Sequence, residues 1–165
     1  MDNTFIVTIL GFVLALTVTG VFYEALCQIS HVISKIGVKP RKHMYIMITG
    51  IFVAHTLAIV IYAVTYWGLI QYAGFAELGG ITNTSFQDYF YFSITSYTSL
   101  GVGDIYPIGG LRLLTGIETL NGLILITWSA TFTYFSVQKM WEAHGIEPKF
   151  CCPPEIYAKK NNKEE

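Results

Sequence analysis

A short segment near the middle of the chain, Thr98 to Asp104, holds the residue types best suited to binding an ion, and we call it the glycine segment. Glycine stands at alternating positions, Gly101 and Gly103, and glycine adopts backbone φ values that other residues avoid. Successive carbonyl oxygens are then free to point the same way, toward a common axis. A ring of such carbonyls can replace the water shell of a cation. The Ser99 hydroxyl would add a further layer of oxygen ligands. The Asp104 carboxylate would attract cations to the entrance of such a ring.

The segment from Phe86 to Thr98 precedes these residues and must position them. Ser85 followed by Asp88 is a capping-box pattern, which predicts that a helix begins here. The helix would be only about 20 Å long, too short to cross a bilayer core of about 30 Å. Non-helical backbone at membrane depth is tolerated only inside protein or along a wet cavity. We therefore predict a re-entrant half-helix whose C-terminus points inward, where its partial negative charge favours a cation.

The composition indicates a membrane protein of one domain. Hydrophobic residues make up 53% of the chain and charged residues 13%, about half the charged share of roughly 25% in soluble domains. The formal net charge of −1 gives no electrostatic reason to expect a nucleic-acid partner. No catalytic triad, metal motif or phosphate-binding loop emerges, so we expect neither an enzyme nor a small-molecule substrate. The lipid bilayer is the expected environment.

The chain divides into six expected regions. These are an N-terminal transmembrane helix with an amphipathic extension (1–36), a basic cytoplasmic loop (37–43), an outer helix (44–73), an extracellular loop with the half-helix and glycine segment (74–110), an inner helix (111–141) and a cytoplasmic tail (142–165). The basic residues at 35–42 place the first loop in the cytoplasm. The N-terminus is then outside and the C-terminus inside. Arg112 is the one basic residue on the outer side.

Aromatic residues of the second span fall toward its ends. Tyr45, Tyr62, Tyr66, Trp67 and Tyr72 are therefore expected at the membrane interfaces, where such side chains gather. Pro40 is expected to end the helical pattern that precedes it.

The stretch from Ser85 to Pro107 resembles the pore loop of potassium channels, whose filter reads T-x-G-[YF]-G-D after a short pore helix. The matching positions are Thr98, Gly101, Gly103 and Asp104, and Ser99 stands at the filter threonine. The resemblance extends to about Trp141 and includes the preceding outer helix, whereas the first span is additional to the minimal two-span members. It implies an all-α membrane protein with a re-entrant pore helix between the second and third transmembrane helices. It also implies a homotetramer around a central pore, because one chain supplies one of four loops.

The resemblance also assigns roles to residues. Ion conduction falls to Thr98, Ser99, Leu100, Gly101, Val102, Gly103 and Asp104, with K+ held at Ser99, Leu100, Gly101 and Val102 as the permeant ion and no cofactor. Tyr91, Phe92 and Thr95 would support the filter. Gly122 falls at the gating hinge, with a packing role as the alternative. Leu123, Ile126, Ala130 and Tyr134 recur at helical spacing and would line the inner cavity, with lipid contact or packing as the alternative.

One departure from the family pattern leaves the function open. Val102 replaces the filter aromatic and is too small to reach the pore-helix aromatics in the same way. The most direct hypothesis is a potassium-selective channel. The alternatives are a weakly selective cation channel that also passes Na+, and a membrane scaffold whose pore loop does not conduct. Because no span is rich in arginine, steep voltage sensing is not expected.

Other polar residues fall inside the spans. Glu118 is predicted to hydrogen-bond behind the filter, to a pore-helix tyrosine, and Asn121 to act similarly. His55 is interpreted as a packed histidine, with a proton relay as the alternative. Glu24, Cys27 and His31 share a helix face and are a weak candidate for a metal site. The three cysteines, Cys27, Cys151 and Cys152, are expected to be free thiols.

Overall fold

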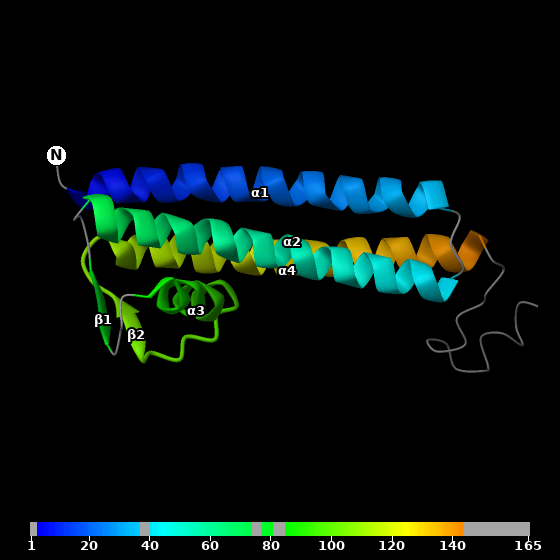
Figure 1. Ribbon diagram of the computed structural model, residues 1–165. Coiled ribbons are helices and arrows are strands. Elements are labelled where there is room, and N and C mark those ends of the chain that lie inside the picture. The colour runs from blue at the N-terminus through cyan, green and yellow to red at the C-terminus, as the bar shows by residue number, and fades with distance from the viewer. Residues whose placement is uncertain (1–2, 37–39, 74–76, 81–84, 144–165) are drawn as a thin grey trace, which may run out of the picture.

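The computed structural model describes residues 3–36, 40–73, 77–80 and 85–143 of the chain. Three long helices run side by side: α1 (Asn3–Ile36), α2 (Pro40–Gly68) and α4 (Leu111–Ala143) (Figure 1). All three are long and apolar enough to cross a membrane. Each of them packs against the other two. The expectation of an all-α membrane protein with three transmembrane helices is therefore confirmed.

Short elements connect α2 to α4. They are a π-helical turn η1 (Leu69–Ala73), the strand β1 (Leu78–Gly80), the helix α3 (Phe86–Tyr97) and the strand β2 (Ile105–Pro107). Figure 1 shows β1, β2 and α3 at the end of the bundle where α1 begins. The end of α1, the start of α2 and the end of α4 lie at the opposite end. Residues 37–39 of the predicted basic loop and 144–165 of the predicted tail lie outside the described residues.

The second helix begins earlier than the sequence predicts. It starts at Pro40 and not at Met44, so Arg41 and Lys42 belong to its first turn and not to a loop. Proline is well tolerated in the first turn of a helix, because its missing N–H would have no partner within the helix there. Pro40 therefore starts α2 in this structure, while α1 has already ended at Ile36.

A two-stranded antiparallel sheet was not predicted. β1 pairs with β2, and Gly80 lies opposite Ile105. The Tyr106 ring covers Gly79 so closely that a β-carbon there would lie 2.4 Å from its Cε2 atom. Strands of three residues carry no detectable alternation of polar and apolar residues. The pairing brings the chain before α3 and the chain after the glycine segment to the same point.

Helix α3 begins where its capping signal predicts. The Ser85 side chain accepts a hydrogen bond from the Gln87 N–H at 3.4 Å, and Thr98 is the C-terminal cap. The last helical residue, Tyr97, bonds through its hydroxyl to His55, in the middle of α2. The helix therefore runs from the β1–β2 end toward the middle of the bundle, and the glycine segment leads the chain back to β2 (Figure 1).

Two aromatic residues expected at a membrane interface lie in the core instead. Tyr62 and Tyr66 are both 0% exposed, on the face of α2 that packs against α3 and α4. Their hydroxyls meet polar groups of α4, since Tyr62 accepts a hydrogen bond from Asn121 and Tyr66 donates to Glu118. Buried tyrosines need such partners. The core at this level is therefore a set of polar junctions between helices, enclosed by apolar side chains.

Candidate ion-conducting site

The glycine segment has an alternating backbone. Ser99, Gly101 and Gly103 have φ values of 60°, 54° and 86°. Among the described residues other than glycine, only Ser99 has a positive φ, so Leu100 and Val102 between them have negative values. A residue in the left-handed region turns its peptide plane in the opposite sense to its neighbours. Carbonyls that would alternate in an ordinary strand are thereby brought to one side.

Hydrogen bonds to α3 fix the direction of two of these carbonyls. The Ser99 N–H donates to the Ser96 carbonyl at 3.0 Å, and the Gly101 N–H donates to the Thr95 carbonyl at 3.1 Å. In a trans peptide the N–H and the preceding C=O point in opposite directions. The carbonyls of Thr98 and Leu100 are therefore directed away from α3, toward the exposed side of the segment. This arrangement presents backbone oxygens as cation ligands.

Asp104, at the end of the glycine segment, interacts with Ile105 and Tyr91. Its Oδ1 atom accepts a hydrogen bond from the Ile105 N–H at 2.9 Å. Interaction with the Asp104 carboxylate raises the pKa of the Tyr91 hydroxyl above its ordinary value of 10.0. Tyr91 thus lies beside Asp104, at the C-terminal end of the segment. Of the other two predicted support residues, Phe92 and Thr95 are buried, and the Thr95 hydroxyl donates to the Phe92 carbonyl at 2.9 Å.

A cavity of about 300 Å³ lies behind the glycine segment. It is lined by Gly101 and Val102 of the segment, by β2, and by residues of α3 and α4, which include Phe92, Thr95, Ser96, Thr115 and Thr119. Val102 is 55% exposed within the single chain. The Val102 side chain therefore borders this cavity without filling it.

Gly122 packs against the end of α3. It is buried, and the nearest atom to a β-carbon at this position would be the Tyr97 carbonyl oxygen. This contact favours the packing interpretation, and the hinge stays a prediction. The predicted cavity-lining residues Leu123, Ile126, Ala130 and Tyr134 are all exposed on α4. Tyr134 is 65% exposed.

Three polar junctions between helices hold the site, and a partner was predicted from the sequence only for Glu118. In the first, the His55 Nδ1 atom lies 2.8 Å from the Tyr97 hydroxyl and its Nε2 atom lies 3.1 Å from the Ser129 Oγ. His55 therefore links α2 to the end of α3 and to α4. The signal in the sequence was a histidine in an otherwise apolar span, but nothing in the sequence identified its partners.

The second junction attaches α1. Thr19 donates to the Asn121 Oδ1 atom at 3.0 Å, and the Asn121 Nδ2 atom donates to the Tyr62 hydroxyl at 3.1 Å and to the Ala15 carbonyl at 3.4 Å. One amide side chain on α4 therefore joins all three long helices. Asn121 is adjacent to Gly122, so the first span is connected to the contact between α3 and α4.

The third junction centres on Glu118. Its carboxyl meets Tyr66 of α2 and Ser93 of α3. The prediction of a hydrogen bond to the pore helix holds, but the partner there is a serine, and the tyrosine belongs to α2.

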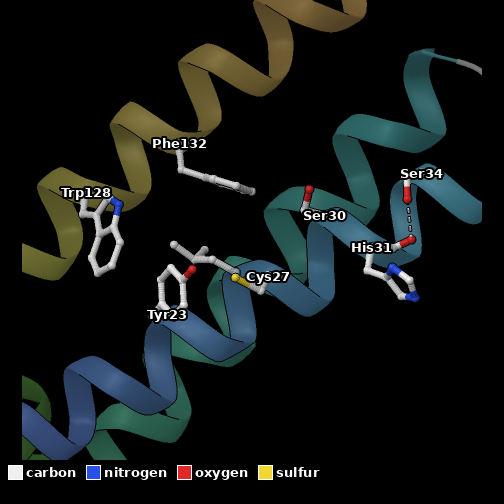
Figure 2. Close-up of a pocket in the computed structure, with 8 residues that line it drawn as sticks. Tyr23, Cys27, Ser30, His31, Ser34, Trp128 and Phe132 are labelled. Atoms are coloured by element: carbon white, nitrogen blue, oxygen red, sulfur yellow. Dashed lines mark hydrogen bonds between the residues drawn. The ribbon is translucent and has the colours of Figure 1, made fainter.

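A groove of about 470 Å³ separates α1 from α4 toward their C-terminal ends. Figure 2 shows Cys27 and His31 on α1 across from Trp128 and Phe132 on α4. Within the part of the chain that the structure describes, no three His, Cys, Asp or Glu side chains gather as metal ligands. The weak metal-site candidate on α1 therefore gains no support. Cys27 is a free thiol, and the other two cysteines lie outside the described residues.

Comparison with known proteins gives a family. A model of a family described as ion channel matches residues 46–138, which is more than half of the chain and extends from α2 to α4. An uncharacterized membrane protein, YdjJ, of Bacillus subtilis (strain 168) is 49% identical over 49 residues. That match covers 29% of this chain and 14% of the relative. No solved structure gives a significant match. The chain belongs to this family of ion channels, and α1 lies entirely outside the residues that carry the family match.

Proposed function

We propose that this chain forms a homotetrameric potassium channel in which four copies of the glycine segment build a carbonyl-lined filter. The observation that carries the proposal is the alternation of φ at Ser99, Gly101 and Gly103. Positive φ at a serine is strained and persists only where the surroundings impose it. The hydrogen bonds from Ser99 and Gly101 to α3 supply that constraint.

The placement of α3 supports a re-entrant loop. The chain leaves β1, reaches the level of His55 and Ser129 at Tyr97, and returns to β2 beside its starting point. In a membrane this path carries non-helical backbone to mid-depth, which is tolerated along a wet pore. The C-terminal end of α3 then favours a cation at that depth.

In the proposed orientation the N-terminus and the β1–β2 sheet face outward, and the C-terminus is cytoplasmic. Lys35, Arg41 and Lys42 lie at the end of the bundle opposite the sheet, in keeping with the inner position of basic residues. The plasma membrane, in a bacterium the inner membrane, is the proposed location. The exposed residues of α4 then line a cavity below the filter, and Tyr134 narrows its inner mouth.

A weakly selective channel that passes both Na+ and K+ is the second candidate. It is favoured by the cavity behind Val102. A filter with open space on the side away from the pore axis is freer to change its diameter. Selectivity in such filters depends on cavity size or on the number and field strength of the carbonyls. A measurement of the preference for K+ over Na+ would decide between the two candidates.

Ion flux in liposomes with opposed K+ and Na+ gradients tests the proposal. Native mass measurement of the same preparation tests the tetramer. A reversal potential near the K+ equilibrium value is expected, and a value near zero would establish the weakly selective channel. Absence of flux from a folded tetramer would favour the scaffold. Gly101→Ala should abolish flux because Gly101 has φ of 54°, whereas Gly20→Ala on α1, with no atom within 4 Å, should not.

A further inference from the structure

Glu118 is a buried acid in the middle of the helix bundle. The residue is 0% exposed, in the part of α4 that faces α2 and α3. Its hydrogen-bond partners are the hydroxyls of Tyr66, 2.5 Å from Oε2, and Ser93, 2.6 Å from Oε1. The other titratable groups that face it are the hydroxyls of Tyr62 on α2 and Tyr97 on α3. Among the described residues, no lysine, arginine or histidine forms an ion pair with it.

The hydrogen bonds of the Glu118 carboxyl and of the Ser93 hydroxyl require three protons. Ser93 Oγ lies 2.6 Å from the Glu118 carboxyl and 3.1 Å from the Ile59 carbonyl oxygen, and Tyr66 contacts the other carboxyl oxygen. A serine or tyrosine hydroxyl has one proton to donate, and a carboxylate has none. A charged Glu118 would leave two protons for three contacts. The approach of Ser93 to Ile59 would then place two oxygens together without a proton between them.

A protonated Glu118 satisfies all three contacts. In that form the acid would donate from Oε1 to Ser93, Ser93 would donate to the Ile59 carbonyl, and Tyr66 would donate to Oε2. The neutral form also avoids a charge in an apolar interior, where an unpaired carboxylate is very costly. Burial in apolar surroundings is known to keep a carboxylic acid neutral so that it serves as a donor.

We propose that Glu118 is a protonated carboxylic acid that positions α3 between α2 and α4. Ser93 lies one turn before Ser96, whose carbonyl receives the N–H of Ser99. Thr119, next to Glu118, donates to the same Ser96 carbonyl at 3.0 Å. The proton on Glu118 therefore holds the turn of α3 that anchors the glycine segment. The effect on ion flux rests on the proposed channel function, whereas the protonation state does not.

Glutamine tests the proposal because it reproduces the neutral acid. Its amide donates to Ser93 and its carbonyl accepts from Tyr66, so Glu118→Gln should keep thermal stability and flux within about twofold of the parent. Glu118→Leu has similar size but no polar atom, and it should lower the melting temperature and reduce flux by about tenfold or more, as expected when buried hydroxyls lose their partner. A glutamine variant as unstable as the leucine variant would overturn the proposal.

Infrared spectroscopy of the purified protein tests the proton directly. At neutral pH the parent should show the carbonyl stretch of a protonated carboxylic acid, and Glu118→Gln should remove it. Glu142→Gln, at an exposed position further along α4, should leave the band in place. A parent spectrum without this band would overturn the proposal. Because the band and the melting temperature need no ion flux, they test Glu118 even if the channel proposal fails.

Discussion

The backbone carbonyl oxygen of Tyr97 lies 2.2 Å from the point that a β-carbon on Gly122 would occupy. Real β-carbons essentially never approach an oxygen so closely, and this oxygen belongs to backbone that cannot turn aside like a flexible side chain. The end of α3 therefore rests on α4 at a distance that only glycine permits. Since Tyr97 immediately precedes the glycine segment, this contact fixes where that segment begins relative to α4.

Gly122→Ala should therefore destabilise the protein. In an exposed helix, replacing glycine by alanine gains about 1 kcal/mol. At Gly122 the added methyl must displace α3, and overpacking of this kind costs about 1–3 kcal/mol. Gly116→Ala is the matched control, because it lies on the same helix with no atom within 4 Å. Thermal unfolding should show a lower melting temperature for Gly122→Ala alone, and equal behaviour of the two variants would contradict the packing role.

Val102→Tyr should increase potassium selectivity. The cavity of about 300 Å³ behind Val102 is lined in part by Phe92, Thr115 and Thr119. An aromatic ring therefore has space there, and the tyrosine hydroxyl would have threonine side chains nearby as hydrogen-bond partners. A filled cavity would restrict movement of the filter wall. The reversal potential under opposed K+ and Na+ gradients should shift toward the K+ equilibrium value. An unchanged reversal potential in a folded tetramer would show that this cavity does not control selectivity.

Much of the local structure was predictable because its signals are local. A capping residue at Ser85, alternating glycines and the lengths of the apolar runs each determine structure within a few residues. The partners of Tyr66, His55 and Glu118 were not predictable in the same way. They depend on how α2 and α4 are rotated about their axes, and a helix that is apolar nearly all round does not reveal which face is buried.

The alternation of φ shows the same limit within the site. Gly101 and Gly103 were expected to take unusual φ values, but the positive φ of Ser99 was not, because serine has no intrinsic preference for that region. The constraint comes from its N–H bond to Ser96 on α3. The glycines that permit unusual φ values were therefore readable from sequence, whereas the constraint that holds Ser99 in its conformation required the fold.

Tyr91→Phe should loosen the C-terminal end of the glycine segment, at Asp104. Asp104 raises the pKa of Tyr91 above 10.0, so their contact is fully present below pH 10 and is lost as pH rises through the raised value. Flux of the parent should thus be steady from neutral pH upward and fall only above about pH 10. Tyr91→Phe should give lower flux at neutral pH and lack the alkaline fall.

Tyr72→Phe is the control for that measurement, since Tyr72 is an 80% exposed tyrosine on η1. It should behave like the parent at both neutral and alkaline pH. If Tyr91→Phe retained the full alkaline fall, the titrating group would lie elsewhere, and the contact with Asp104 would not support the filter.

Thr19→Val should weaken the attachment of α1 to the pore region. The change keeps the shape of the side chain but removes the donor to Asn121 Oδ1, which leaves a buried acceptor without its partner. Hydrogen bonds between membrane helices contribute about 0.6 kcal/mol on average and up to about 1.7 kcal/mol. We expect a loss of that size in the free energy of unfolding and faster amide hydrogen exchange in α1.

Thr17→Val provides the matched control on the same helix. Thr17 is exposed, and its hydroxyl donates to the Val13 carbonyl of its own helix at 2.8 Å, so its removal should leave the contact between α1 and α4 intact. Because Asn121 adjoins Gly122, a specific effect of Thr19→Val on channel open probability would show that the first span acts on the pore through this junction. Equal stability, hydrogen exchange and open probability in the two variants would mean that apolar packing alone holds α1 in place.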